Sequence, residues 1–389
     1  MGPGMNGELR SSSPTVGVFR LDLFKHSETF IAAQAARYVR YDPLFIGRGR
    51  LGEAPAGARL AVLASGAERV RAVGLGDPAP FLKALGGVRP ALIHAHFAID
   101  GAFAVPLAQS LGAPLVTTLH GFDVTTRDLE IVKGARPAPL LALARRGRLQ
   151  RQGALFLCVS DFIRRAALAK GFPAERTVVA PLGIDLERRQ PFGVSTPGLI
   201  VHVGRMVEKK GTLYLIRAFA RMAPKAPAAR LVIVGDGPLR GSLEAEAASL
   251  GLGERIVFTG GLDHATTLDW MSRASVVAVP SVTAANGDSE GLPTVVFEAG
   301  ALARAVVATR NSGIPEAVDD GETGLLAPER DVEALAAALE RLTGDPEMAA
   351  RFGQAGRQLM LQRYDAAKLT AALEARYDAL LAGEAVSAA

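Results

Sequence analysis

The sequence predicts an α/β protein built from two doubly wound parallel sheets. Three observations lead to this prediction. Short, wholly apolar runs recur along the chain with helical patterns between them, which is typical of buried parallel strands joined by crossover helices. The 389 residues are 49% hydrophobic and 21% charged, enough for two domains with ample cores. A polar stretch with two prolines and two glycines, residues 186–198, divides the alternating pattern.

The second half of the chain shows the alternation most clearly. From residue 198 onward its strand-like runs are GLIVHVG, ARLVIVGDG, RIVFTGG, SVVAVPS, AVVATR and GLLAP. Helices are expected between them over residues 212–223, 239–250, 266–273, 293–303 and 331–342. Repeated strand and helix units of this kind predict a parallel sheet with helices on both faces.

The first half repeats the pattern with less regularity. Its strand-like runs are TVGVFRL, ALIHAHF, PLVTTLHG, ALFLCVS and TVVAPLG, with helices expected near 28–39, 101–111 and 158–170. We expect a flexible tail over 1–14, a first Rossmann-like domain over 15–185, a linker over 186–198, a second Rossmann-like domain over 199–362, and a terminal helix over 363–389. This terminal helix could pack back on the first domain. Two such domains in tandem form a cleft, and open α/β sheets bind ligands beyond the carboxyl ends of their strands.

Cysteine content and hydropathy predict the cellular compartment, and the charge distribution predicts which half of the chain meets an anionic surface. The one cysteine, Cys158, lies in an apolar run, so we expect a buried thiol in a reducing cytoplasm and no intramolecular disulfide. Residues 1–14 lack the basic and apolar segments of a signal peptide, and no run reaches ~18 apolar residues, so a cytoplasmic protein is expected. Residues 1–190 carry 25 Lys and Arg against 15 Asp and Glu, whereas residues 191–389 carry 19 against 24. The first half is therefore the one expected to meet an anionic surface.

Two glycine-rich motifs directly follow expected strands. In GRMVEKKG, Arg205 and Lys210 lie on a glycine-bounded loop that enters a helix, where cations beside backbone amides suit a diphosphate. An ordinary solvated loop is the alternative. The VGDGP turn, with Gly235 and Asp236, lacks the third glycine of a dinucleotide fingerprint. A tight turn and a contact to a nucleobase therefore stay open as alternatives for it.

Histidines give one site candidate and no metal site. His120 directly follows an apolar strand and precedes a glycine, which makes it a better candidate than His94 inside its strand. His94 and His96 lack a nearby third ligand, and no Asp-x-Asp motif occurs, so no metal site is expected.

Two glutamates, Glu290 and Glu298, frame an apolar stretch in SEGLPTVVFEA. Pro293 suits the first turn of a helix because its missing N–H costs nothing there. We therefore expect Glu290 in the preceding loop and Glu298 about one and a half turns inside the helix. A helix N-terminus beside a glutamate suggests a site.

The ordered motifs of this chain resemble those of retaining glycosyltransferases of the GT-B fold, family GT4. The resemblance covers nearly the whole chain and is carried by GRMVEKKG, GDGP, SEGLPTVVFEA and NSGIPEAV. Near the N-terminus, KHSETFI, HAHF and HGFDVT look like the subgroup that builds exopolysaccharide, capsule and colanic acid. The resemblance implies two Rossmann-like domains facing a central cleft, and transfer of a sugar from a nucleotide-diphosphate donor.

The resemblance also implies roles for single residues. Glu290 would face the hydroxyls of the transferring sugar near its reacting carbon, and Glu298 would accept hydrogen bonds from the ribose. Arg205 and Lys210 match the family's diphosphate pair, and His120 matches a histidine near the reacting centre. The amides that would cradle the donor belong to Gly291, Leu292, Thr294 and Val295, with Gly235 and Asp236 as further binding candidates.

The first loop departs from the pattern of many relatives. They carry a glycine pair near the acceptor and phosphate, whereas this chain has Ser27 and Glu28, which is typical of the named subgroup. Ser27 and Glu28 are therefore candidates for substrate binding on the acceptor side, with the role of Glu28 left open.

The implied partners are a nucleotide-sugar donor and a glycan or lipid-diphosphate acceptor, without nucleic acid, cofactor or divalent metal. In the family the leaving phosphate takes the acceptor's proton and the sugar keeps its configuration; double displacement is the alternative. Four arginines within residues 137–156 make peripheral contact with the anionic inner face of the cytoplasmic membrane about as plausible as an ordinary solvated helix. Other functions open to the sequence are a nucleotide-sugar epimerase, a glycan phosphorylase, and a non-catalytic nucleotide-sugar binding subunit.

Overall fold

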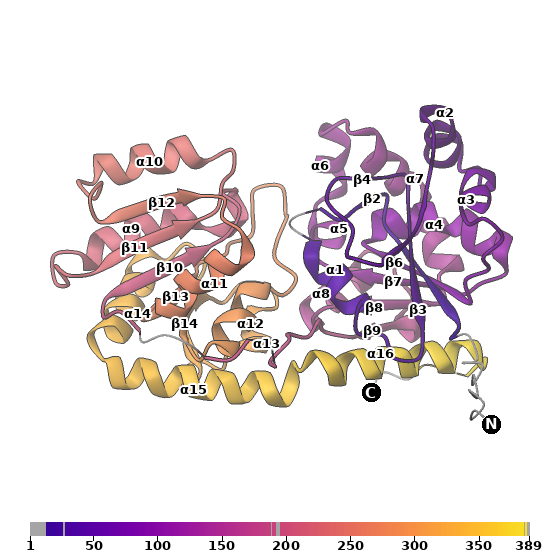
Figure 1. Ribbon diagram of the computed structural model, residues 1–389. Coiled ribbons are helices and arrows are strands. Elements are labelled where there is room, and N and C mark those ends of the chain that lie inside the picture. The colour runs from indigo at the N-terminus through magenta and orange to yellow at the C-terminus, as the bar shows by residue number, and fades with distance from the viewer. Residues whose placement is uncertain (1–12, 26–27, 188, 192–194, 385, 387–389) are drawn as a thin grey trace, which may run out of the picture. The chain divides into compact units, whose positions relative to one another are not determined.

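The structure is a computed structural model that describes residues 13–25, 28–187, 189–191, 195–384 and 386 (Figure 1). Most of the expected N-terminal tail, Ser27, and part of the expected linker lie outside the described residues. The chain groups into two compact units, each described here by itself. The first comprises the chain up to Thr118, Pro137–Phe156, and the chain from Thr370 onward. The second comprises Leu119–Arg136 and Leu157–Leu369. The domain boundaries expected from the linker remain a prediction.

The first sheet is parallel and has seven strands. In spatial order they are β5 (Arg59–Val62), β3 (Asp42–Gly47), β1 (Thr15–Phe19), β6 (Leu92–His96), β7 (Leu115–Leu119), β8 (Leu155–Cys158) and β9 (Thr177–Val179). The central strand β1 pairs in parallel with β3 and β6. A separate short pair is formed by β2 (Asp22–Leu23) and β4 (Gly49–Arg50). The five strands expected in this half are confirmed, and burial raises the pKa of the Cys158 thiol as expected for a core cysteine.

Strands β3 and β5 were not expected, for two physical reasons. Pro43 lies within β3, and a proline lowers the expectation of a strand because it cannot donate to the ladder. The edge strand β5 buries only Ala61 among its four residues, so it lacks the apolar run of a covered strand. Both strands are held by pairing within the sheet rather than by a strong local pattern.

The first helix of the first unit is α1 (Thr29–Ala35), and the last is α16 (Ala366–Leu381), which belongs to this unit from Thr370 onward. Between them lie α2 (Gly66–Arg69), the π-helical turn η2 (Val70–Leu75), α3 (Ala79–Ala84), α4 (Ala98–Leu111) and α7 (Pro137–Gln152). Helix α4 packs against α7 and against β6. The expected helices near 28–39 and 101–111 are therefore confirmed as α1 and α4.

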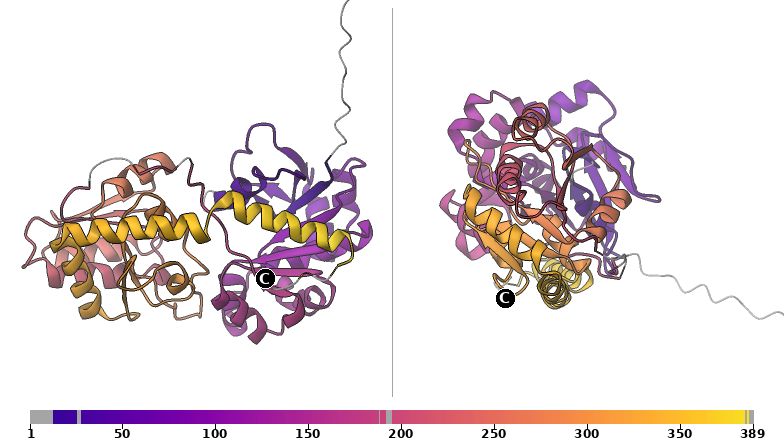
Figure 2. Two further views of the ribbon diagram at one scale, coloured as in Figure 1. Left: turned by 90° about the horizontal axis from the view of Figure 1, so that it is seen from below. Right: turned by 90° about the vertical axis from the view of Figure 1, so that its left-hand side faces the viewer.

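The C-terminal helix α16 is labelled in Figure 1 and lies at the yellow end of the colour scale, and from Thr370 it belongs to the first unit. Figure 2 shows it in two further views. Glu374 accepts hydrogen bonds of 2.9 Å from the N–H groups of Val39 and Arg40. The buried Tyr377 hydroxyl lies 2.5 Å from Nδ1 of His94, whose Nε2 lies 2.7 Å from the Thr118 hydroxyl. Burial lowers the pKa of His94 to about 3. His94 is thus a neutral core histidine that helps to anchor α16.

The second unit contains a six-stranded parallel sheet. Its spatial order is β12 (Ile256–Gly260), β11 (Arg230–Val234), β10 (Leu199–Val203), β13 (Val276–Val279), β14 (Ala305–Thr309) and β15 (Gly324–Ala327). One face packs against α9 (Thr212–Met222), α10 (Arg240–Ser249) and α14 (Val332–Gly344). The other face carries α11 (His264–Arg273), α12 (Thr294–Ala301) and α15 (Pro346–Arg363). All six strands and all five helices expected from the sequence are confirmed.

Shorter helices complete the second unit. They are α5 (Phe122–Thr125), α6 (Asp128–Lys133), α8 (Asp161–Ala169), η3 (Ala174–Arg176), η4 (Glu208–Lys210) and α13 (Ile314–Ala317). Helix α8 confirms the helix expected near 158–170. In the described part of the chain, no helix combines the length and the apolar character that crossing a membrane requires.

Candidate active site

Three loops of the second unit pack backbone against backbone around Gly291. A Cβ atom at Gly291 would overlap the carbonyl oxygen of His120, and one at Gly313 would overlap the carbonyl oxygen of Gly291. The Ser160 hydroxyl donates to that same Gly291 oxygen at 3.1 Å. Only glycine at these positions permits the approach. The loop that carries His120 and the loop that carries Glu290 are thereby held together.

Glu290 and Lys210 form a largely buried ion pair. Lys210 Nζ lies 2.9 Å from Oε1 of Glu290, with 18% and 10% of the two side chains exposed. Burial opposes ionisation of Glu290, but the charges of Lys210 and Lys209 outweigh it and hold the pKa of the carboxyl below its usual value. Glu290 is therefore an anion near neutral pH, paired with a cation from the loop after β10.

Two glycines direct Lys210 toward this position. The aliphatic part of Lys210 lies against Gly204, where an added Cβ would come within 3.1 Å of its Cδ. Gly211 adopts φ 65°, and a Cβ there would overlap the carbonyl oxygen of Pro280. The backbone after β10 thus packs on the backbone after β13, which brings Lys210 and Glu290 together. Lys209 adds a second link through an ion pair of 3.0 Å with Asp288.

Arg205 lies on the same loop as Lys210, and its side chain is exposed. The neighbouring VGDGP turn is packed against this loop, because a Cβ at Gly235 would overlap the carbonyl oxygen of Gly204. Gly235 has φ 134°, and the exposed Asp236 accepts a 2.7 Å hydrogen bond from the Gly237 N–H. A Cβ at Gly237 would overlap the carbonyl oxygen of Met206, so backbone packing explains both glycines of the motif. A contact of Gly235 or Asp236 with a nucleotide remains a prediction.

Glu298 lies inside α12, as expected, since that helix begins at Thr294 directly after Pro293. Its side chain is 12% exposed, and Oε1 lies 3.8 Å from Nε2 of His264. Burial raises the pKa of Glu298 to about 7, although the charge of Arg189 opposes the rise. At the start of the helix, Leu292 and Val295 are buried whereas Thr294 is exposed.

His120 is placed by a short turn after β7. The N–H groups of His120 and Gly121 donate to Oδ1 of Asp123 at 3.2 and 2.9 Å. Gly121 has φ 152°, and a Cβ there would come within 3.1 Å of the Gly291 nitrogen and 3.2 Å of the Ser289 carbonyl oxygen. The second unit therefore collects His120, Arg205, Lys210, Glu290 and Glu298 on neighbouring segments of one compact unit.

Glu28, by contrast, lies in the first unit. It receives two hydrogen bonds from the Arg20 guanidinium, at 2.9 and 2.7 Å. Ser27 lies outside the described residues.

Several polar residues that support the site were missed by sequence reasoning. Asn311 is fully buried and donates to Oε1 of Glu329 at 2.7 Å, while Oε2 of Glu329 accepts from the Thr283 N–H at 2.8 Å. The hydroxyls of Ser289 and Ser312 are hydrogen-bonded to each other. These contacts fasten the loop before Glu290 to the loop after β14. The one sequence feature that could have indicated these contacts is the position of Asn311, Ser312 and Gly313 directly after an apolar strand.

Glu316 of the NSGIPEAV motif has a structural task in this fold. Its carboxylate accepts hydrogen bonds from the N–H groups of Asp161 and Phe162, at 2.8 and 3.0 Å, at the first turn of α8. A carboxylate there satisfies amides that lack helical partners. The motif thus fixes α8 beside the Gly291 loop, which Ser160 also contacts.

Two family models match the chain over adjoining segments. The model of Glycosyl transferases group 1 matches residues 184–359, and that of Glycosyltransferase Family 4 matches residues 26–188. The GDP-mannose-dependent alpha-(1-6)-phosphatidylinositol monomannoside mannosyltransferase of Mycolicibacterium smegmatis is 33% identical over 67% of this chain and 69% of its own length. The Amylovoran biosynthesis glycosyltransferase AmsK of Erwinia amylovora is 33% identical over 64% of this chain. The match spans 60% of the length of AmsK.

Solved structures share the fold at lower identity. Anabaena Alr3699/HepE in complex with UDP has a TM-score of 0.74 and 20% identity, with 94% of this chain and all of that chain covered. The sucrose-phosphate synthase of Thermosynechococcus elongatus has a TM-score of 0.76 and 21% identity, covering 95% of this chain and all of its own. Both are GT-B proteins, and the fold of this chain is GT-B.

Proposed function

This chain belongs to the group 1 glycosyl transferases, and on that premise we propose that it moves a sugar from a nucleotide-diphosphate donor to a glycan or lipid-linked acceptor. The observation that carries the proposal is the ion pair of 2.9 Å between Lys210 and Glu290. It places a cation and an ionised carboxylate at the carboxyl edge of a parallel sheet, where such folds bind ligands. HepE is solved with UDP and with UDP-glucose, which supports a nucleotide-sugar donor.

The donor diphosphate would be held by cations and amides. Lys210 and the exposed Arg205 share one loop and would bind the phosphate oxygens. The amides of Gly291, Leu292 and Thr294 precede or open α12, whose N-terminal dipole favours negative charge. Glu298 would accept hydrogen bonds from the ribose.

The reaction breaks the bond between the anomeric carbon and the diphosphate oxygen, and the electron pair leaves with that oxygen. The acceptor hydroxyl forms the new bond on the same face and gives its proton to the leaving phosphate, so that the sugar keeps its configuration. Lys210 and Arg205 stabilise the charge that develops on the leaving oxygen. Glu290 orients the hydroxyls of the transferring sugar, and His120 lies near the reacting carbon. Because the chain supplies these cations, the proposal needs no divalent metal and no cofactor.

The proposal places the protein in the assembly of a cell-surface polysaccharide, on the cytoplasmic side of the membrane. The name of AmsK, which includes amylovoran biosynthesis, supports this setting. Peripheral attachment would use basic residues of the first unit. In α7, however, Arg145 donates to the carbonyl oxygens of Val73 and Gly74 at 2.9 and 2.7 Å, and Arg148 donates to Gln109. Two of the four arginines of α7, Arg145 and Arg148, are therefore engaged in contacts within the protein.

A donor screen with product analysis tests the function. The protein is incubated with UDP-, GDP- or ADP-sugars and a mixture of glycan acceptors, and nucleoside diphosphate and glycan products are quantified. Transfer releases one nucleoside diphosphate for each sugar added to an acceptor, and NMR of the new linkage reports its configuration. An epimerase would change the sugar while it stays on the nucleotide, a phosphorylase would need inorganic phosphate, and a binding subunit would show no turnover.

A further inference from the structure

A buried histidine, His202, interrupts the otherwise apolar strand β10. Its Nδ1 lies 2.9 Å from the carbonyl oxygen of Ala278 in β13. Its Nε2 lies 3.0 Å from the hydroxyl of Thr212, the first residue of α9. Both ring nitrogens therefore have partners, and the ring links two strands of the second sheet to the start of a helix.

The two partners determine which nitrogen of the ring carries the proton. A carbonyl oxygen can only accept, so Nδ1 of His202 donates to Ala278. Burial lowers the pKa of His202 to about 4, and the charge of Lys210 acts in the same direction. The ring is therefore neutral near pH 7, Nε2 is an acceptor, and the Thr212 hydroxyl donates to it.

His202 and Thr212 depend on each other. Thr212 is buried, so an apolar residue in place of His202 would leave its hydroxyl without this partner, at a cost in free energy. Two apolar side chains could fill the same space. A hydrogen bond, however, is directional, whereas an apolar contact is not. The pair therefore fixes the orientation of Thr212 as well as its burial.

The start of α9 is also the end of the loop that carries Lys210. Only Gly211 separates Thr212 from Lys210, and a Cβ at Gly211 would overlap the carbonyl oxygen of Pro280. The aliphatic part of Lys210 turns back over Gly204, two positions after His202. The bond between His202 and Thr212 thus fastens the end of this loop directly beside Lys210.

We propose that His202 is a positioning residue for Lys210: through Thr212 it sets the end of the loop so that the ammonium group reaches Glu290 and the donor diphosphate. The inference rests on the proposed transferase function, which assigns the diphosphate to Lys210. Displacing a group in an active site by about 1 Å can lower a rate roughly 10²-fold. A buried link that never touches the substrate can therefore control turnover.

Thr212→Val tests the link, because valine keeps the shape of threonine and removes its hydroxyl. Donor affinity and turnover per folded molecule should each fall about fivefold, which corresponds to the loss of one hydrogen bond. Thr212→Ser keeps a hydroxyl and should restore both. Thr177→Val is the matched control: Thr177 is buried, donates to the Pro173 carbonyl oxygen at 2.7 Å, and begins β9 of the other sheet. It should bind and turn over donor like wild type.

A double-mutant cycle with Lys210→Ala separates positioning from a purely structural role. Thr212→Val should weaken donor binding in the wild-type background and leave it unchanged in the Lys210→Ala background. The same loss in both backgrounds, or no loss in either, overturns the inference. If Thr212→Val does not fold, His202→Asn replaces it, since the asparagine amide can still donate to Ala278 but is too short to reach Thr212.

Denaturant unfolding of the same four proteins tests the placement of Lys210 without any donor. Lys210 stabilises the fold through Glu290 only where it is correctly placed, so Lys210→Ala should lower the unfolding midpoint less in the Thr212→Val background than in wild type. Equal lowering contradicts the inference. Coupled midpoints with no donor bound to wild type would reject the transferase proposal and leave the placement of Lys210 by His202 standing. Donor binding with independent midpoints would reject this inference alone.

Discussion

Glu290 and Glu298 lie in the same unit, eight positions apart, yet their surroundings act on them in opposite directions. Lys210 and Lys209 lower the pKa of Glu290 despite its burial. Glu298 has no lysine at ion-pair distance among the described residues, and burial raises its pKa to about 7. Glu290 precedes the start of α12 and Glu298 lies within it. One short segment therefore supplies Glu290, which is ionised near neutral pH, and Glu298, whose pKa lies near 7.

Glu298 should make folding stability depend on pH. The folded state binds the Glu298 proton more tightly than the unfolded state, so stability falls as pH rises from 4.5 to about 7 and stays reduced above it. The rise in pKa from 4.5 to about 7 corresponds to about 3 kcal/mol. Glu298→Gln should remove this part of the pH dependence. Denaturant unfolding at pH 5 and pH 8 measures it, and an identical pH dependence in wild type and Glu298→Gln would disprove it.

Lys210→Ala should lower both stability and turnover. The substitution leaves a buried Glu290 anion without its partner, which costs about 3 kcal/mol, and it lowers the transfer rate by roughly 10²–10³. Adding Glu290→Gln to Lys210→Ala removes the uncompensated charge. The double variant should therefore regain most of its unfolding free energy while its turnover stays low. If the double variant regained turnover as well as stability, the Lys210 and Glu290 pair would have only a structural role.

At the scale of elements, packing between loops decides where the candidate side chains lie. Gly291, Gly121 and Gly313 let three backbone segments meet where any side chain would overlap an oxygen or crowd a nitrogen. The sequence predicted the strands, the helix start at Pro293 and the residues that follow each strand. It could not predict which loops would touch, because that depends on backbone contacts between segments more than 100 positions apart, such as His120 and Gly291.

Gly291→Ala should disturb the site far more than an ordinary substitution. Its Cβ would overlap the His120 carbonyl oxygen, so one loop must move. We expect a loss of turnover of at least tenfold, with a lower melting temperature. Gly241→Ala in α10 is the control: its Cβ meets nothing within 4 Å, and alanine favours a helix by roughly 0.5–1 kcal/mol. Wild-type turnover in Gly291→Ala would show that the loop contact does not position the site.

Other elements show why prediction was uneven. Five strands of the second sheet, β10, β11, β13, β14 and β15, are almost wholly buried, so each contains an apolar run that is easy to recognise. The edge strand β12 is recognisable from its apolar residues Ile256, Val257 and Phe258, although Val257 is 46% exposed. The edge strand β5 has no such run. Polar supports such as Asn311 and Glu329 leave no periodic signal, since their partners come from separate loops.

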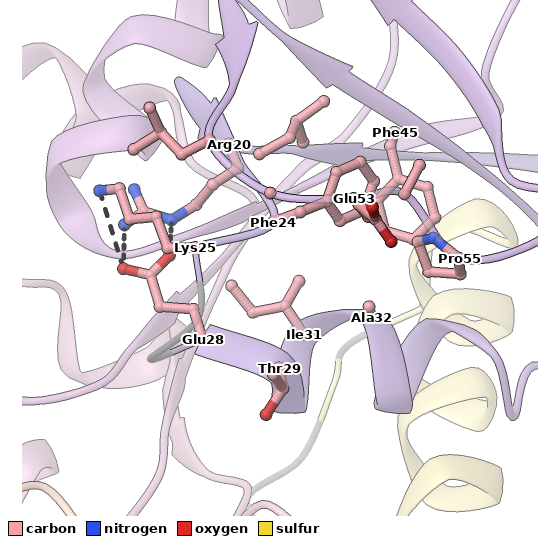
Figure 3. A pocket seen from close by; sticks show the side chains of 14 residues that line it. Arg20, Phe24, Lys25, Glu28, Thr29, Ile31, Ala32, Phe45, Glu53 and Pro55 are labelled. Atoms are coloured by element: carbon pink, nitrogen blue, oxygen red, sulfur yellow. Dashed lines mark hydrogen bonds and ion pairs between the residues drawn. The ribbon is translucent and has the colours of Figure 1, made fainter. Parts of the chain in front are cut away.

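At the scale of the whole molecule, the sequence separates a basic half from an acidic half. Residues 1–190 have a net charge of +10 and residues 191–389 of −5. The fold class was predicted correctly from strand and helix alternation, and the family from ordered motifs. A cavity in the first unit (Figure 3) could not be predicted, because its wall includes Phe24, Phe45 and Leu51, residues without a motif.

The charge asymmetry predicts salt-sensitive binding to anionic membranes. Vesicles containing anionic lipid should sediment more of the protein than neutral vesicles at low salt, since each basic residue near such a surface contributes roughly 1 kcal/mol. High salt should reverse the binding. Changing Arg146 and Arg151 to Gln should weaken it without removing the contacts of Arg145 with η2. Equal sedimentation with both vesicle types would leave the basic half as a solvated surface.

Calorimetric titration tests whether the second unit binds a nucleotide-diphosphate sugar through its own cations. UDP-, GDP- and ADP-sugars are titrated into the protein in the presence of a chelator, with Arg205→Ala and the exposed Arg351→Ala as a matched pair. We expect at least one donor to bind wild type and Arg351→Ala equally, and to bind Arg205→Ala at least tenfold more weakly. Absence of binding by all three donors, or equal binding to Arg205→Ala, would contradict it.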